Sequence, residues 1–142
     1  MLDPSPNITT RVRALLAGAT PASQREARVL FTYLKAKLVL WVYAQGWEIA
    51  EGEGLVALTD ARDGDHDGPH KAGGAHYLGT GEDLVLYLDL DGDAQVDDYV
   101  SRGGHPVWKA IGEKWESMHP SCRWGGRFGD DNHVSIHWAG RS

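Results

Sequence analysis

The chain has 142 residues, a formal net charge of −6, 42% hydrophobic residues and 24% charged residues. This length is typical of a single domain, and the composition is not that of a disordered chain. The acidic balance argues against a nucleic-acid-binding protein, because such proteins need cationic side chains to neutralise phosphates. The single cysteine, Cys122, excludes an internal disulfide framework and a cysteine-rich zinc site.

Two features of the sequence bear on whether the protein is directed to or across a membrane. The first ten residues carry neither a basic segment nor an apolar core, so we expect no signal peptide. The longest strongly apolar stretch, residues 38–44, is far shorter than the roughly 20 residues of a membrane-spanning helix. We therefore expect a cytoplasmic protein that has no stable association with membranes.

A short helix is expected near the amino terminus. Residues 1–8 have the character of a loose arm, and the helix that follows them can end at Gly18. We assign residues 1–20 to this arm and helix, and residues 21–142 to the main domain.

A long helix is expected next, with Thr20 as a candidate N-cap, Pro21 in the first turn and Gly46 in the stop position after Gln45. Its apolar residues recur at steps of three and four, which is the period of an amphipathic helix. The expected core-facing residues are Leu30, Leu34, Leu38, Trp41 and Val42, with Val29, Tyr33 and Leu40 widening the stripe.

The rest of the chain predicts short strands and one more helix. Strands are expected near Trp47 and over residues 55–58, 84–90 and 134–138, and a helix is expected from Pro106 to Met118. Residues 60–75 are rich in Gly, Asp and His and carry no regular pattern. These elements predict an α+β fold of two or three helices packed on a small, largely antiparallel sheet.

Four polar residues near the ends of these strands form a plausible zinc site. His76, Asp83 and His133 supply two imidazoles and a carboxylate, which suits a tetrahedral zinc ion with a fourth position for water. Asp130, three residues before His133, can act as the general base and acid. Such a site favours hydrolysis, because zinc polarises a carbonyl and lowers the pKa of water.

The same residues lie in two motifs. The first runs from Gly74-Ala75-His76 to Glu82-Asp83-Leu84, and the second is Trp124-Gly125-Gly126-Arg127-Phe128-Gly129-Asp130-Asp131-Asn132-His133. Together they resemble the zinc D-alanyl-D-alanine carboxypeptidase and L-alanyl-D-glutamate endopeptidase family, which includes many bacteriophage endolysins. The first is similar to that family's Ser-x-His, six residues, Asp pattern, with Gly74 in the place of the Ser. The second matches its Trp-Gly-Gly segment followed by Phe-x-Asp-x-x-His.

The resemblance implies a fold like that of the hedgehog and DD-peptidase proteins. It also implies Zn²⁺ as cofactor, with His76, Asp83 and His133 as ligands and Asp130 as the catalytic carboxylate. The implied substrate is the peptidoglycan stem peptide, cleaved at its L-Ala–D-Glu bond. The enzyme would act as an endolysin that stays in the cytoplasm of the bacterial host until it is released to the cell wall, and we expect it to be a monomer.

Substrate-binding residues follow from the same resemblance. Family members often carry an Arg upstream that stabilises the oxyanion, but residues 55–58 occupy that region here without one. Arg62 and Arg127 are the candidates to replace it. Trp124 can wall the substrate cleft, and His137 can line it from the last strand.

Two alternatives to this interpretation stay open. A D-Ala-D-Ala carboxypeptidase would use the same scaffold and zinc ligands. A non-catalytic zinc-binding protein that recognises the cell wall would be an inactive relative, and its expected sign is loss of the catalytic carboxylate. Asp130 is present in this chain.

The segment Asp89–Asp93 resembles the start of a calcium-binding loop. Its glycine, Gly92, stands at the fourth position rather than the sixth, and Val100 replaces the bidentate Glu. We therefore expect a hairpin turn with solvated acidic residues.

Overall fold

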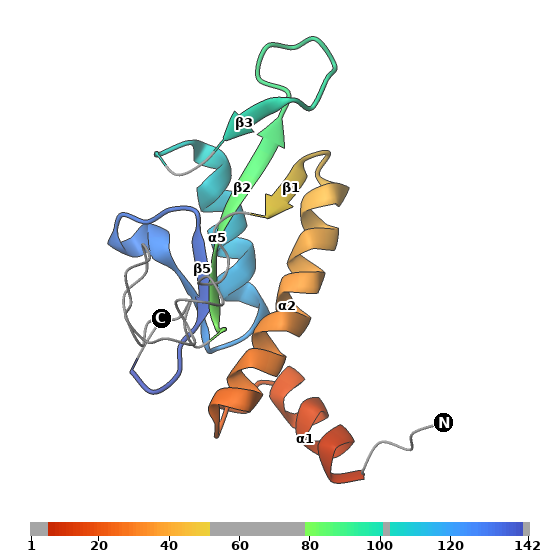
Figure 1. The fold of residues 1–142 in the computed structure, drawn as a ribbon, viewed down its shortest axis with the longest axis vertical. Coiled ribbons are helices and arrows are strands. Elements are labelled where there is room, and N and C mark those ends of the chain that lie inside the picture. Colours follow the sequence, from red (N-terminus) through yellow and green to blue (C-terminus); the bar gives the residue numbers. More distant parts are fainter. Residues whose placement is uncertain (1–5, 52–78, 101–102, 141–142) are drawn as a thin grey trace, which may run out of the picture.

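The computed structural model describes residues 6–51, 79–100 and 103–140 (Figure 1). Within these residues the chain forms three helices and a five-stranded antiparallel sheet, which confirms the expected α+β fold. The helices are α1 (Pro6–Leu16), α2 (Gln24–Ala44) and α5 (Pro106–Met118). The strands are β1 (Glu48–Glu51), β2 (Gly81–Leu88), β3 (Asp98–Val100), β4 (Cys122–Trp124) and β5 (His133–Ile136), and a 3-10 helix, η1 (Gly125–Phe128), follows β4. The strand predicted at residues 55–58 and the irregular segment at 60–75 lie outside the described residues.

The central strand of the sheet is β2. Its first half pairs with β5, so that Asp83 lies opposite His133. Its second half pairs with β1 and β3, and Leu86 has a partner in each of these two strands. Strand β4 pairs with the far edge of β5. The last strand of the chain therefore lies next to a strand from its middle.

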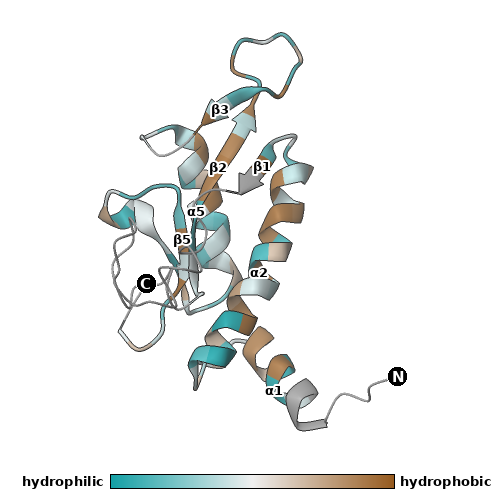
Figure 2. Ribbon diagram, in the orientation of Figure 1, coloured by the Kyte–Doolittle hydropathy of each residue, from teal (hydrophilic) through white to brown (hydrophobic). Residues whose placement is uncertain are grey.

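The two faces of the sheet differ, because side chains alternate between the faces along a strand. Leu84, Leu86, Val134 and Ile136 are buried in the same hydrophobic cluster as the helices. Figure 2 shows the hydrophobic character of β2. Asp83 and His133 occupy the intervening positions, so their side chains lie on the sheet face that points away from the helices.

Helix α2 presents one face to the core. Its buried residues are Ala27, Leu30, Phe31, Leu34, Leu38 and Val42. The prediction that Val29, Tyr33 and Leu40 widen this face is wrong, because their exposed fractions are 37%, 45% and 72%. With 3.6 residues per turn these three side chains fall on the opposite side of the helix. Among the described helices, none combines the length and the apolar character that a bilayer crossing requires.

The helix ends follow from local hydrogen bonds. Ser23 caps α2, since its Oγ accepts from the Glu26 N–H at 3.2 Å, so the helix begins later than the Thr20 cap predicted. Gly46 has a φ of +84° after the last turn, which confirms the predicted stop. Helix α1 already begins at Pro6, so residues 6–8 are helical and do not belong to a loose arm.

Helix α5 has the predicted bounds. His105 caps it, because its Nδ1 accepts from the Val107 N–H at 3.1 Å, and Pro106 opens the first turn. Buried Trp115 donates from Nε1 to the Ser135 carbonyl at 2.9 Å and meets the Phe31 ring edge-on with 5.7 Å between ring centroids. These contacts fasten α5 to both β5 and α2.

Helix α1 shares this core. Leu15 is buried, and its carbonyl lies 2.8 Å from Nε2 of buried His119, directly after α5. The Nδ1 of the same ring accepts from the Ser121 N–H at 2.9 Å. The amino-terminal helix is thereby joined to the turn that leads into β4.

Candidate functional site

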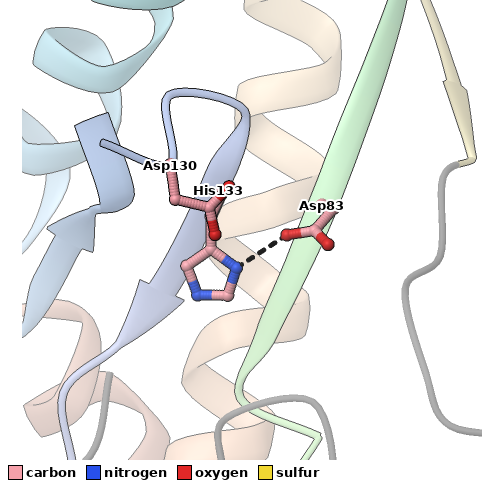
Figure 3. A group of neighbouring side chains, drawn as sticks. All are labelled: Asp83, Asp130 and His133. Carbon is pink, nitrogen blue, oxygen red and sulfur yellow. Dashed lines mark hydrogen bonds and ion pairs between the residues drawn. The ribbon is translucent and has the colours of Figure 1, made fainter. Parts of the chain in front are cut away.

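Three of the four predicted site residues come together on the sheet face that points away from the helices. Asp83, Asp130 and His133 each offer one potential ligand atom, and these atoms lie within 4.8 Å of one another (Figure 3). The His133 Nδ1 lies 2.9 Å from an Asp83 carboxylate oxygen. The remaining predicted site residue, the ligand His76, and the candidate Arg62 lie outside the described residues.

The register of β2 and β5 explains why Asp83 and His133 meet. Leu84 donates to the Asn132 carbonyl, and Ile136 donates to the Thr80 carbonyl. Hydrogen-bonded pairs alternate with non-hydrogen-bonded pairs in an antiparallel ladder, so the intervening pair of Asp83 and His133 is of the second kind. In such pairs the Cα atoms are only about 4.5 Å apart and the side chains are closest.

Asp130 reaches the site through a tight turn. The His133 N–H donates to the Asp130 carbonyl at 3.1 Å, which closes a β-turn over residues 130–133. The Asp130 N–H donates in turn to the Gly125 carbonyl at 3.0 Å. A Cβ at Gly125 would overlap the Asp130 carbonyl oxygen and come within 2.8 Å of the His133 Cβ. The first glycine of the Trp-Gly-Gly segment is therefore needed for this close approach.

Trp124 packs between two further glycines. A Cβ at Gly112 of α5 or at Gly126 of η1 would overlap its indole ring. The indole Nε1 donates to the Asp131 carbonyl at 2.6 Å, in the turn that carries Asp130. In the described part of the chain, half-buried Trp124 connects α5 to the site turn; its role as a wall of the substrate cleft stays a prediction.

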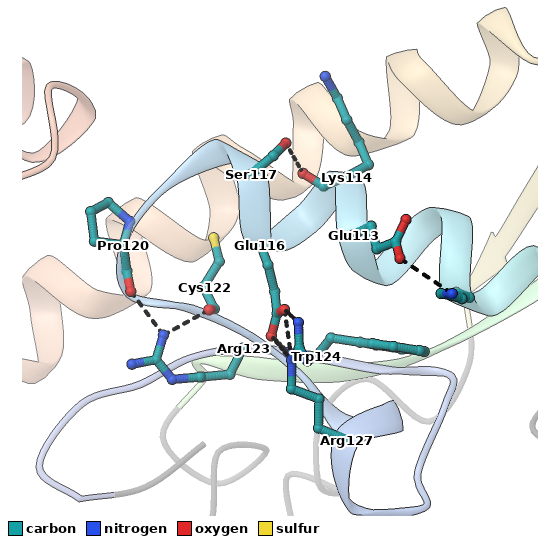
Figure 4. Close-up of polar contacts among 10 residues, drawn as sticks. Glu113, Lys114, Glu116, Ser117, Pro120, Cys122, Arg123, Trp124 and Arg127 are labelled. Carbon is teal, nitrogen blue, oxygen red and sulfur yellow. Dashed lines mark hydrogen bonds and ion pairs between the residues drawn. The ribbon is translucent and has the colours of Figure 1, made fainter.

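Arg127 already has an anionic partner. Its guanidinium forms an ion pair with Glu116 of α5, and the Nε lies 2.8 Å and 3.0 Å from the two carboxylate oxygens (Figure 4). Glu116 also accepts from the Trp124 N–H at 3.0 Å. The hydrogen bond from Arg127 lowers the pKa of Glu116 and raises the pKa of Arg127 itself. A substrate carboxylate would therefore compete with Glu116 for Arg127.

His137 lies one residue beyond the end of β5, which stops at Ile136, earlier than the sequence pattern predicts. Its side chain is exposed, and its backbone N–H donates to the Ser121 carbonyl at 2.7 Å. Its role as a cleft residue stays a prediction.

The donor set fits zinc. Zinc in proteins binds imidazole nitrogens and carboxylate oxygens at about 2.0–2.2 Å, so two ligand atoms of a tetrahedral site lie about 3.3 Å apart. The 2.9 Å between His133 Nδ1 and the Asp83 oxygen is close to that separation. The His133 side chain is 11% exposed and that of Asp83 is 25% exposed, so the donors are shielded from solvent but not sealed from it.

Other carboxylates gather in the loop between β2 and β3, and they differ from the site. Asp89, Asp91 and Asp93 are exposed and accept from backbone N–H groups of the same loop, at 2.9 Å from Gly92, 3.1 Å from Asp93 and 2.8 Å from Gln95. The hairpin is longer than its Asp-Gly signal suggests, because residues 89–97 separate the strands. These acids shape the loop.

Sequence reasoning missed two residues that support the site. Gly112 interrupts a helix at a cost of about 1 kcal/mol relative to Ala, and such a glycine is a recognised sign of close packing. Asn132, next to His133, is 6% exposed and donates from its side-chain amide to the Leu84 carbonyl at 2.7 Å. No pattern in the sequence signals that contact.

No family model matches the chain, and no curated protein matches it. What the site can do chemically is therefore inferred from the residues that form it. The carboxylates of Asp83 and Asp130 and the imidazole of His133 lie close together. Such a group can bind a divalent cation, and it can accept and release a proton.

Proposed function

We propose that this protein is a zinc-dependent peptidoglycan peptidase, similar to bacteriophage endolysins, that hydrolyses the L-Ala–D-Glu bond of the stem peptide. The observation that carries the proposal is the convergence of Asp83, Asp130 and His133. These residues occupy the ligand and base positions of the two motifs, and Asp83 and His133 are 50 positions apart in the chain.

His76, Asp83 and His133 would hold the metal in this proposal. When bound there, zinc supplies Lewis-acid polarisation of a carbonyl and of water. The β2–β5 ladder holds the backbones of Asp83 and His133 opposite each other, and their donor atoms lie 2.9 Å apart. The partial burial of the pair limits competing water and strengthens its electrostatic interactions.

Asp130 would move the proton. Its half-buried carboxylate lies at the edge of the site, where it can take a proton from water at one oxygen and deliver it to the leaving amine. The turn that ends at His133 fixes its backbone relative to the ligands. Residues for the substrate would be Trp124, Arg127, His137 and Arg62.

Peptidoglycan digestion followed by mass spectrometry tests this function. The zinc-loaded protein should generate new amino termini on D-glutamate. Release of D-alanine alone would instead establish a D-Ala-D-Ala carboxypeptidase. Binding of zinc and cell wall without any new terminus would establish the non-catalytic protein.

The variant Asp130→Asn tests the assignment of the base. It should lower hydrolysis by at least about 10²-fold, which is typical of the loss of a general base, while zinc affinity is maintained. Asp131→Asn is the matched control, because Asp131 is the next carboxylate in the chain but points its oxygens at the Gly103 and Gly104 N–H groups. Loss of zinc in Asp130→Asn would make Asp130 a ligand.

A further inference from the structure

The ladder between β2 and β5 ends in an irregular pair beside the site. Leu84 donates its N–H to the Asn132 carbonyl at 2.8 Å. In a regular antiparallel pair the backbone N–H of Asn132 would also donate to the Leu84 carbonyl. Here the side-chain amide of Asn132 donates to the Leu84 carbonyl instead, at 2.7 Å. One side chain thus completes the pair.

This pair is adjacent to both proposed metal ligands. Leu84 follows Asp83, and Asn132 precedes His133. Asp83 and His133 form a non-hydrogen-bonded pair, so no backbone bond joins them directly. Residues 130–133 form the turn that leads into β5. At this end of the ladder, the bonds between Leu84 and Asn132 are the ones that join β2 to the chain entering β5.

The burial of Asn132 makes the bond from its amide energetically important. The residue is 6% exposed, and its Oδ1 accepts no hydrogen bond among the described residues. A buried polar group of this kind is costly unless it is hydrogen-bonded. The compensating interaction is the bond from Nδ2 to Leu84.

We infer that Asn132 is a positioning residue, whose side-chain amide fixes the separation of Asp83 and His133 and so sets the metal affinity of the site. The part of the inference that concerns zinc affinity rests on the proposed function. It also predicts the Asp83–His133 geometry of the metal-free protein, which is measurable independently.

The test compares Asn132→Ala with Ser135→Ala. Ser135, three residues further along the chain in β5, is the control, because it is fully buried and its hydroxyl has no hydrogen-bond partner among the described residues. Zinc affinity is measured by competition with a chromophoric chelator. Asn132→Ala should weaken zinc binding about 10- to 100-fold, as loss of groups that orient metal ligands does, and Ser135→Ala should leave it unchanged.

Asn132→Asp separates positioning from charge and provides a second variant if the alanine protein does not fold. It keeps the size of the side chain but replaces the NH₂ donor by a carboxylate oxygen. An added negative charge alone would strengthen cation binding, whereas loss of the bond to Leu84 weakens it. Weaker zinc binding supports the inference, and equal or stronger binding with the fold intact overturns it.

The metal-free readout is the ¹⁵N chemical shift of the His133 ring, which reports the hydrogen bond to Asp83. It should change in Asn132→Ala and stay constant in Ser135→Ala. If the wild-type protein binds no zinc, the proposed function fails and this signal alone decides the positioning role. An unchanged ring signal in Asn132→Ala would overturn that role.

Discussion

The indole of Trp124 occupies the space that a side chain at Gly112 would need. The ring also donates to the Asp131 carbonyl, and the Trp124 backbone N–H donates to Glu116. Helix α5 therefore supports the turn that carries Asp130 through one aromatic residue. The packing of α5 and the geometry of the site are mechanically linked.

Gly112→Ala should destabilise the protein, although alanine is the better helix former. The overlap with Trp124 costs about 1–3 kcal/mol, as overpacked cores do, against a gain in helix propensity of about 1 kcal/mol. Urea denaturation measures the free energy of unfolding. In a Trp124→Leu background the same glycine change should cost much less, because the ring is gone. A stabilising Gly112→Ala in the wild-type background would contradict this packing.

Asp83→Asn should weaken zinc binding by more than the 10- to 100-fold that is typical of outer-shell changes, because it removes a charged ligand. The amide can still accept a hydrogen bond from His133, so the fold should be maintained. Chelator competition measures the affinity. Asp89→Asn, a change to an exposed carboxylate just after the same strand, should have no effect on zinc. Equal affinities for the two variants would remove Asp83 from the ligand set.

Glu116 should make the stability of the folded protein depend on pH. Arg127 lowers the pKa of Glu116 in the folded protein below its ordinary value of 4.5. Ionised Glu116 therefore stabilises the fold above about pH 4.5, and this contribution is lost as the pH falls through the lower folded pKa. The Tm difference between wild type and Glu116→Gln should be largest near neutral pH and should shrink on acidification toward about pH 3. A difference that is constant with pH would indicate that the ion pair does not contribute.

Cys122 should be chemically inert in the folded protein. The side chain is 2% exposed, and burial raises the pKa of its thiol to about 12. Since the thiolate is the nucleophile, an alkylating reagent should not label the native protein at about pH 8 and should label it fully in guanidinium. Rapid labelling of the native protein would show that β4 opens frequently.

Local signals predicted the helices well, and their limits are visible in particular residues. Helix α5 runs from Pro106 to Met118 as expected, and Gly46 stops α2. The predicted start of α2 is too early, because Thr20 and Ser23 are both residues that favour the N-cap position. The cap is Ser23, whose Oγ accepts from the Glu26 N–H in the first turn. The exposed Tyr33 and Leu40 show that apolar character alone does not define a core face.

Long-range features were less accessible to sequence reasoning. Strands β3 and β4 are too short to carry an alternating pattern, and they exist because β2 and β5 offer them an edge. Motif spacing anticipated that Asp83, Asp130 and His133 belong together. The groups that Gly112 and Gly125 approach, and the carbonyl that the Asn132 amide bonds, are set by tertiary packing, which no local pattern encodes.

The distance along the chain between Asp83 and His133 has a consequence for how the donor pair forms. These residues are 50 positions apart, with β3, α5 and β4 between them, so the donor pair forms only after a large loop has closed. Any fluctuation that detaches β5 separates the pair and also removes Val134 and Ile136 from the hydrophobic core. A cation held there would stabilise the closed chain in proportion to its affinity. Under the proposed function, hydrolytic activity would thus belong to completely folded molecules alone.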